Sequence, residues 1–209
     1  MKNVKLLFVL AVFIFGQSIS ANAQVQFGVK AGLNLANLNY SDEFDTDTKM
    51  LPSYMAGVIV EFPFSDNLGL GTGIQLQGKG AKGDDGDDDE SKATMSYLQV
   101  PVQLQYTNNG LFAAVGPYVA FGIGGKFDDG AGTEEDISYG SSIDDDFSAL
   151  DFGVNLEVGY SFGQLRATAS YGLGLANGIP ADVQDFIGDG SVKHAVIGVS
   201  LAYLFGSGE

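Results

Sequence analysis

Apolar and polar residues alternate along most of the chain. In QFGVKAGLNL (26–35) every second residue from Phe27 to Leu35 is apolar, and the residues between them are polar or glycine. The same period of two runs through LGLGTGIQLQ (68–77) and LDFGVNLEVGY (150–160). Alternation over about ten residues is typical of a strand that crosses a membrane as part of a β-barrel.

Segments of this kind recur with regular spacing. Eight are predicted, at 25–36, 52–63, 68–79, 94–106, 111–125, 147–161, 164–176 and 192–205. Short connectors at 64–67, 107–110 and 161–164 alternate with long polar ones at 37–51, 80–93, 126–146 and 177–191. Outer-membrane barrels have short periplasmic turns and long external loops. We therefore predict an all-β fold for residues 24–205, an eight-stranded antiparallel up-and-down transmembrane β-barrel with short periplasmic turns and long acidic extracellular loops.

A soluble sandwich or lipocalin-like barrel is the structural alternative, because it also has short alternating strands. Two features argue against it. The more polar face of the strands is rich in glycine and carries charges, whereas a soluble barrel would fill its interior with apolar side chains. Aromatic residues also collect at the predicted periplasmic strand ends, where an interfacial girdle belongs: Phe62, Phe64, Tyr106, Tyr160, Phe162, Tyr203 and Phe205.

Two prolines, Pro101 and Pro117, fall inside predicted strands. Proline has no N–H to donate to a sheet, and a closed barrel has no edge strand to accommodate it. We expect bulges or missing ladder hydrogen bonds at both positions.

The first 23 residues read as a secretory signal peptide. Lys2 and Lys5 precede an apolar stretch of about ten residues and a final Ala-Asn-Ala, with cleavage expected after Ala23. The alternative is an uncleaved anchor helix, but the apolar stretch is shorter than the ~20 residues that a spanning helix needs. Residues 206–209 are expected to be a short tail beyond the barrel.

The net charge and the lack of cysteine limit which partners the chain can bind and which kinds of site it can form. Without Lys2 and Lys5, the 10 basic residues fall to 8 against 26 acidic ones. So negative a chain is expected to repel nucleic acid and anionic headgroups. There is no cysteine, which excludes disulfides and thiolate metal sites. The expected partners are outer-membrane lipid, lipopolysaccharide bridged through divalent cations, and a protein at the extracellular loops or periplasmic turns.

Charged residues on the inward face of the strands form the main candidate cluster. An eight-stranded barrel has an interior just wide enough for side chains to fill. The inward charges should therefore lie together in the lumen and pair: Lys30, Glu61, Asp151, Glu157 and Arg166. We favour a structural plug over a proton or ion path, and a water-filled pore would need a larger barrel.

Apart from the inward charges, few residues are candidates for catalysis. His194 is the single histidine, on the inward parity of the last strand, with Ser191 nearby in sequence. Nucleophilic catalysis needs a base beside Ser or an acid, but no G-x-S-x-G motif or histidine pair is present. We therefore predict no catalytic residue and no enzyme activity, with a lipid-modifying or proteolytic enzyme that uses His194 as the less favoured alternative.

The run AKGDDGDDDESK (81–92) offers weak metal candidates, Asp85, Asp87, Asp89 and Glu90. The first three keep the every-second-residue spacing of a calcium loop. Glu90 stands where an EF-hand needs glycine, and Ser96 where it needs a bidentate Glu. A preformed site is therefore not predicted. We expect no cofactor beyond weak Ca²⁺ or Mg²⁺ binding at acidic loops.

Several strand motifs resemble the PorT-like family of outer-membrane β-barrels, typical of Bacteroidota. They are FGVKAGLNLANL (27–38), YLQVPVQLQY (97–106), GPYVAFGIGGK (116–126), DFGVNLEVGYSF (151–162), ASYGLGLANG (169–178) and GVSLAYLF (198–205). The resemblance implies an eight-stranded outer-membrane barrel and, for most members, no assigned activity. One branch assists a secretion system, but no motif here identifies that branch.

The sequence thus favours a small closed barrel with a structural or partner-binding role through its acidic loops. A divalent-cation-responsive surface protein and an accessory of a secretion or uptake machine are the alternatives.

Overall fold

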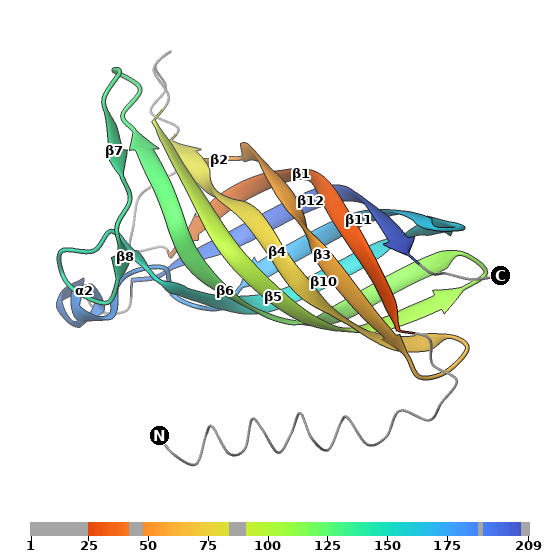
Figure 1. The fold of residues 1–209 in the computed structure, drawn as a ribbon. Helices are drawn as coiled ribbons and strands as arrows, with labels where there is room; N and C mark the ends of the chain where they lie inside the picture. The colour runs from red at the N-terminus through yellow and green to blue at the C-terminus, as the bar shows by residue number, and fades with distance from the viewer. Residues whose placement is uncertain (1–24, 42–47, 84–90, 188–189, 206–209) are drawn as a thin grey trace.

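A computed structural model describes residues 25–41, 48–83, 91–187 and 190–205. In it, one antiparallel sheet closes on itself as a barrel (Figure 1). The eight long strands are β1 (Gln26–Tyr40), β3 (Leu51–Pro63), β4 (Leu68–Gly83), β5 (Lys92–Asn108), β6 (Leu111–Asp128), β10 (Leu150–Phe162), β11 (Leu165–Gly174) and β12 (Val192–Phe205). The predicted fold class is confirmed.

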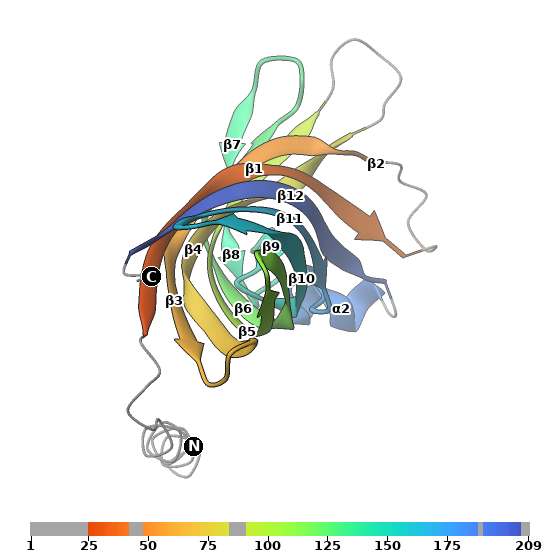
Figure 2. The same ribbon diagram turned by 90° about the vertical axis from the view of Figure 1, so that its right-hand side faces the viewer.

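Each long strand pairs with the next long strand in the sequence, and the last long strand pairs with the first to complete the ring. β6 pairs with β10 across the third long connector, and β12 pairs with β1 along its whole length. Figure 2, turned by 90°, shows β12 beside β1 in the closed wall. Closure matters in a membrane because it leaves no strand edge with unpaired backbone groups in lipid.

The short turns lie at one end of the barrel: the one at 64–67 is as predicted, and the other two are two residues shorter than predicted, at 109–110 and 163–164. β5 and β6 are joined by Asn109 and Gly110 alone, with φ of 49° and 84°. Both residues thus adopt the left-handed conformation that a two-residue hairpin turn favours. Gly163 (φ 64°) serves the β10–β11 turn in the same way.

The other end of the barrel, here called the loop end, is larger than predicted. β4, β5 and β6 run several residues into the expected loops, to Gly83, from Lys92 and to Asp128. The connectors also contain elements that the alternation did not predict. These are β2 (Thr48–Lys49), β7 (Glu134–Asp136), β8 (Tyr139–Gly140) and the helix α2 (Ala181–Ile187). Residues 147–148, predicted as the start of the strand at 147–161, instead form the separate strand β9 (Phe147–Ser148).

Both strand prolines interrupt a ladder, as predicted. Pairing between β4 and β5 skips the positions at Pro101, and pairing between β5 and β6 skips those at Pro117. The Thr72 hydroxyl donates to the carbonyl of Pro101 at 2.8 Å, which satisfies one acceptor at the gap. The register shift in β5–β6 lies elsewhere, between Ser96 and Tyr97.

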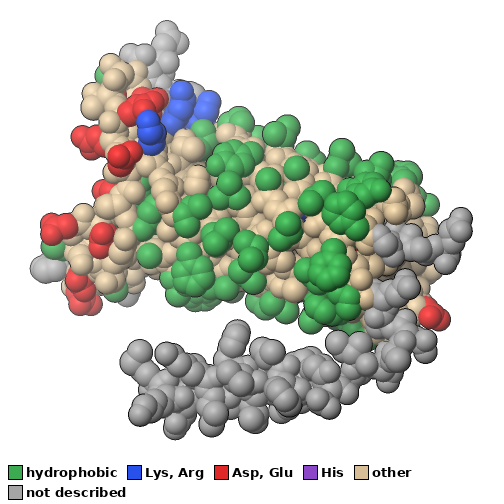
Figure 3. All heavy atoms as spheres, viewed as in Figure 1, with side chains coloured by type: hydrophobic (Ala, Val, Ile, Leu, Met, Phe, Trp, Pro, Cys, Tyr) green, Lys and Arg blue, Asp and Glu red, His purple; other side chains and the backbone are tan. Residues whose placement is uncertain are grey.

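The outer surface of the barrel is an apolar belt. Figure 3 shows hydrophobic side chains covering the wall, with acidic side chains gathered at the loop end. At the short-turn end, rings pair on the outside: Tyr160 with Phe162 at 4.7 Å between centroids, and Tyr203 with Phe205 at 5.1 Å. These are positions where the sequence predicted an aromatic girdle. Among the described residues, no helix has both the length and the apolar character to span a membrane.

Candidate functional site

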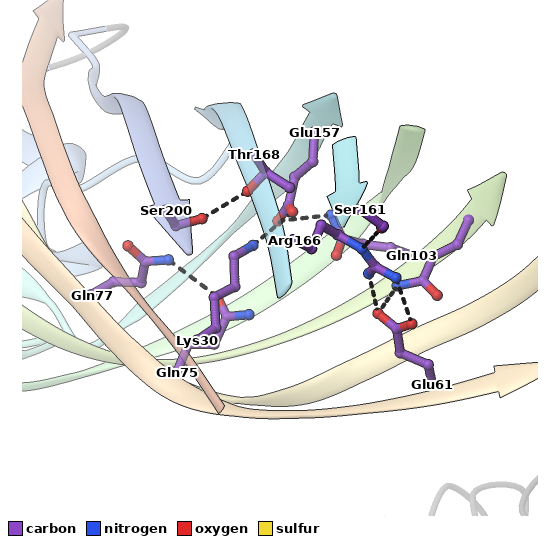
Figure 4. Close-up of polar contacts among 11 residues, drawn as sticks. Lys30, Glu61, Gln75, Gln77, Gln103, Glu157, Ser161, Arg166, Thr168 and Ser200 are labelled. Atoms are coloured by element: carbon purple, nitrogen blue, oxygen red, sulfur yellow. Dashed lines mark hydrogen bonds and ion pairs between the residues drawn. The ribbon is translucent and has the colours of Figure 1, made fainter. Parts of the chain in front are cut away.

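The lumen is filled by polar side chains from the inward face of the strands. Three ion pairs lie at successive levels along the barrel axis, and glutamines, asparagines and hydroxyls occupy the space between them. Figure 4 shows the two levels nearer the short-turn end. All five charges predicted for the lumen are buried, but they belong to three separate pairs rather than to one cluster.

Nearest the short turns, Arg166 of β11 binds Glu61 of β3. Its two terminal nitrogens reach both carboxylate oxygens, at 2.5 and 3.1 Å, and its Nε donates to the Ser161 hydroxyl at 3.0 Å. The guanidinium also stacks on Phe112, 3.9 Å from the ring centroid. A two-pronged contact of this kind fixes the arginine in orientation as well as in position.

At the middle level, Lys30 of β1 lies 2.6 Å from Glu157 of β10. The amide of Gln103 donates to the other oxygen of Glu157 at 3.4 Å. Thr168 and Ser200 share a hydrogen bond of 2.7 Å beside this pair. The network therefore joins the walls of the barrel across its centre.

At the loop end, Lys79 of β4 pairs with Asp151 of β10 at 2.5 Å. The Tyr118 hydroxyl donates to the same Asp151 oxygen at 3.1 Å, and the Lys79 ammonium lies 4.6 Å from the Tyr118 ring centroid. The predicted cluster omitted Lys79. Its parity could have revealed it, because Lys79 continues the inward series of Gln75 and Gln77 along β4.

The lumen leaves almost no free space. Two cavities of about 20 Å³ each lie in the lumen, one lined by Lys30, Glu61 and Arg166, the other by Lys79 and Tyr118, and Glu157 lines both. A void of this size and polarity holds a single water molecule. Ion pairs, amides and hydroxyls thus occupy the lumen around these two cavities.

The mouth at the loop end is covered by apolar side chains from the long connectors. Ile137, Tyr139, Phe147 and Ile179, here called the mouth cap, pack on a buried cluster that includes Tyr97 and the Tyr118 ring. The Tyr139 hydroxyl donates to the carbonyl of Gly124 at 3.1 Å. Burial raises the pKa of Tyr139 above its ordinary value of 10.0, so this phenol stays neutral.

His194 lies under the mouth cap and is 2% exposed. Its Nε2 is 3.3 Å from the Tyr97 hydroxyl, and its Nδ1 has no hydrogen-bond partner among the described residues. Neither ring nitrogen bonds to Ser191, whose backbone carbonyl accepts from the Ser41 N–H and whose N–H donates to the Ser41 hydroxyl. The structure therefore does not bring His194 and Ser191 together as a catalytic pair.

The weak metal candidates Asp85, Asp87, Asp89 and Glu90 lie outside the described residues. Ser96, the twelfth position of the hypothetical calcium loop, belongs to β5, where its hydroxyl is 3.3 Å from the Tyr54 hydroxyl. Within the described part of the chain, no group of three or more His, Asp or Glu side chains is placed to hold a metal ion.

A family model described as "Outer membrane protein beta-barrel domain" matches residues 15–179. Among solved structures, Neisserial surface protein A is 9% identical with a TM-score of 0.52, covering 85% of this chain and 96% of that one. Ail of Yersinia pestis is 13% identical with a TM-score of 0.46, covering 87% and 99%. The N-terminal β-barrel domain of Pseudomonas aeruginosa OprF is 11% identical with a TM-score of 0.36, covering 88% and 100%. No curated protein matches the chain.

Proposed function

Because the chain belongs to the outer membrane β-barrel domain family and is an integral outer-membrane protein, we propose that it acts as a closed, non-conducting barrel that binds a protein partner at its loop end. The observation that carries this proposal is the filled lumen. Three buried ion pairs and the mouth cap occupy the lumen, and the two cavities lined by these pairs measure about 20 Å³ each, so we place the function on the surface.

The loop end supports a role in partner binding. It presents extended strand ends, the β6–β7 hairpin and α2, whereas the turns at the opposite end are two to four residues long. Acidic side chains gather there, as Figure 3 shows, and Ile143 exposes 60% of its surface among them. Protein interfaces commonly have an apolar centre within a polar rim, and Ile143 among acidic side chains fits that arrangement.

On this proposal the protein is not an enzyme and needs no cofactor. The surroundings of His194 support this, since the ring is buried beneath the mouth cap and touches a tyrosine rather than a nucleophile. A substrate would have to displace the cap to reach it. His194→Gln is expected to leave lipid and protein profiles of the outer membrane unchanged, and an altered lipid A or protein pattern would contradict this.

Planar-bilayer recording tests the closed lumen. The purified full-length mature chain should give no conductance steps, because one-water voids separated by salt bridges cannot support a continuous water column. Stable steps from the wild-type protein would overturn the proposal of a non-conducting barrel.

Photo-cross-linking in intact cells tests the partner. A photoreactive residue placed at Ile143 should give a discrete protein adduct. The same residue at Leu156, which faces lipid, should not. A third photoreactive residue at Asp66 probes a short turn. An adduct at Asp66 and none at Ile143 would show that the partner binds the opposite end of the barrel. Protein adducts at neither end would refute partner binding.

The strand motifs also support a place among PorT-like barrels. An accessory role at a secretion or uptake machine is the alternative within the same proposal. The identity of the cross-linked protein decides between them, since a component of such a machine would favour the accessory role.

A further inference from the structure

His194 is the single histidine of the chain, and it lies where the barrel meets the mouth cap. Its partner across the β1–β12 ladder is Leu38, and the neighbouring pair of Asn39 and Lys193 is exposed on the outer wall. The last exposed large apolar side chain of β1 is Leu35. The ring therefore lies beyond the apolar belt and belongs to the loop end, not to the membrane-spanning part of β12.

The imidazole is buried with one of its nitrogens unused. Nε2 is 3.3 Å from the Tyr97 hydroxyl, whereas Nδ1 has no hydrogen-bond partner in the described part of the chain. A neutral ring has one N–H and one lone pair, and a protonated ring has two N–H groups and a charge. Burying a charge without a partner is costly, so the closed mouth suits the neutral ring.

The charges around the ring also oppose a proton. The Lys79 ammonium and the His194 ring both lie close to the Tyr97 ring, at 5.0 and 5.2 Å from its centroid, so a protonated imidazole would stand near a like charge. The Asp151 carboxylate acts in the opposite sense, but Lys79 and Tyr118 already bind it. Burial first, and Lys79 second, lower the pKa of His194 from its ordinary value of 6.5 to about 4.

The other titratable groups packed here do not change charge in mild acid. They come from the surrounding elements: Tyr40 (β1), Lys79 (β4), Tyr97 (β5), Tyr118 (β6), Tyr139 (β8) and Asp151 (β10). β11 and the fourth long connector contribute Gly174 and Ile179, which do not titrate. Phenols and ammonium groups ordinarily titrate at about pH 10 and carboxylates at about pH 4. His194 is therefore the group that responds as the medium becomes mildly acidic.

Apolar packing and hydrogen bonds hold the mouth cap over the ring. Tyr139 packs edge-on against Tyr97, with 5.6 Å between the ring centroids, and its hydroxyl donates to the carbonyl of Gly124. The N–H of Ile137 donates to the carbonyl of Gly125 at 3.0 Å. Three of the four cap side chains are only partly buried. A cover of this kind opens locally at much lower cost than the barrel unfolds.

We propose that protonation of His194 opens the mouth cap and thereby releases the partner bound at the loop end. When the cap is displaced, water reaches the ring, which then titrates at the ordinary value of about 6.5. Ile143 lies between Tyr139 and Phe147 in the sequence, so the surface that it marks moves with the cap. The opening follows from the contacts of His194, whereas the release rests on the partner-binding function proposed above.

Linkage gives the direction of the effect and its pH window. The open form binds the proton below about pH 6.5 and the closed form only below about pH 4, so acid favours the open form within this window. The ratio of open to closed cap rises about tenfold for each pH unit, to a limit of about three-hundredfold. A cap that is open in about one molecule in a hundred at neutral pH is thus mostly open at about pH 4.

Hydrogen exchange of the full mature chain in micelles tests the opening. After division by the intrinsic exchange rate, the protection of the Ile137 N–H should fall about fortyfold between pH 6.5 and 4.5. The protection of the N–H of Leu201, in the middle of β12, should stay constant. In His194→Gln the Ile137 N–H should lose its pH dependence in this window. The matched control is Tyr97→Phe, which keeps the imidazole and should keep the dependence.

The wild-type ring gives a second measurement. Because the chain has a single histidine, the imidazole resonance of the untagged protein is unambiguous, and it should titrate below 6.5. A ring that titrates at about 6.5 while the Ile137 N–H stays protected would overturn the opening. So would a pH-dependent protection that persists in His194→Gln. Heat-modifiable migration in SDS gels at neutral pH shows whether each variant is folded.

Photo-cross-linking from Ile143 in isolated envelopes tests the release. The adduct formed at pH 7.5 should fall by more than half at pH 4.5 in the wild type, and it should persist at pH 4.5 in a His194→Gln background. An adduct that the wild type keeps at pH 4.5 would overturn the release, even where hydrogen exchange shows that the cap opens. No adduct at either pH would refute the partner-binding function and the release with it, while the exchange data decide the opening by themselves.

Discussion

The Nζ of Lys79 lies 2.5 Å from an oxygen of Asp151, with both side chains at most 4% exposed. The two residues are 72 positions apart in the sequence and sit on β4 and β10, which β5 and β6 separate around the barrel. This pair closes the loop-end level of the lumen, directly beneath the mouth cap. Its burial makes it the most informative place to test the energetics of the plug.

Replacing the cation should destabilise the barrel strongly. Lys79→Met leaves the Asp151 carboxylate buried with only the Tyr118 hydroxyl to oppose its charge, and we expect the free energy of unfolding to fall by about 3–5 kcal/mol. Urea unfolding in lipid vesicles measures it. The matched control is Lys126→Met, because the Lys126–Glu134 pair has the same 2.5 Å distance but exposed side chains. That variant should leave the free energy of unfolding close to that of the wild type, because exposed ion pairs contribute little.

Removing both members of the buried pair should restore stability. Lys79→Met/Asp151→Leu eliminates the unpaired charge, so it should be more stable than Lys79→Met alone, because apolar replacements of buried pairs are often close to neutral. A double variant as unstable as the single one would mean that packing, and not charge, dominates at this level.

Arg166 should not tolerate lysine. Lysine offers a single point charge, so Arg166→Lys loses the second contact to Glu61, the bond to Ser161 and the flat face on Phe112. We expect a loss of about 1–3 kcal/mol in the free energy of unfolding, measured in the same urea assay. Phe112→Leu keeps the ion pair and serves as the comparison. If it costs as much as Arg166→Lys, the ring rather than the two-pronged contact holds Arg166.

Two neighbouring glycines of β6 should differ in their effect on the mouth cap. A Cβ at Gly122 would collide with the Tyr139 ring, whereas a Cβ at Gly124 would meet open space. Gly122→Ala should therefore displace the Tyr139 ring and speed proteolysis within residues 129–149 roughly fivefold, as expected when local opening becomes about 1 kcal/mol easier. Gly124→Ala should leave the rate near that of the wild type. Equal rates for the two variants would contradict the packing assigned to Tyr139.

The turn after β6 should respond to acid. The backbone N–H groups of Thr133 and Ala131 donate to the Asp129 carboxylate, and they hold its pKa below the ordinary value of 3.8. A lowered pKa means that the bonded turn is favoured above the ordinary pKa and is lost as pH falls through the lower, folded value. Amide chemical shifts of Thr133 and Ala131 should therefore change with a midpoint below 3.8.

Asp129→Asn provides the control for that titration. The amide oxygen still accepts the two hydrogen bonds but has no acid to titrate, so the shifts of Thr133 and Ala131 should no longer depend on pH in this range. A wild-type midpoint above 3.8 would mean that the turn does not stabilise the carboxylate.

The sequence by itself determined the fold and the face on which each strand residue lies. Both follow from a local property, since successive side chains of a strand point to opposite sides and a shift of one residue would turn every apolar side chain inward. The inward positions of Lys30 and Glu157 could therefore be predicted from parity alone, and so could the break in pairing at Pro101. The alternation of short and long connectors was likewise enough to give the up-and-down order of the strands.

Only the tertiary structure decided which residues meet. The pairing of side chains in the lumen depends on the stagger between strands around the closed barrel. This stagger places Lys30 beside Glu157, 127 positions away in the sequence, and Lys79 beside Asp151. The mouth cap was equally hidden, because Ile137 and Tyr139 stand in a polar connector without periodicity and are packed against the core only when that connector folds over the opening. The order of the lysines at the loop end depends on strand register as well. Lys49, Lys82 and Lys92 become neighbours only because β2, β4 and β5 pair at those residues, and their hydrogen bonds run between strands rather than along the sequence.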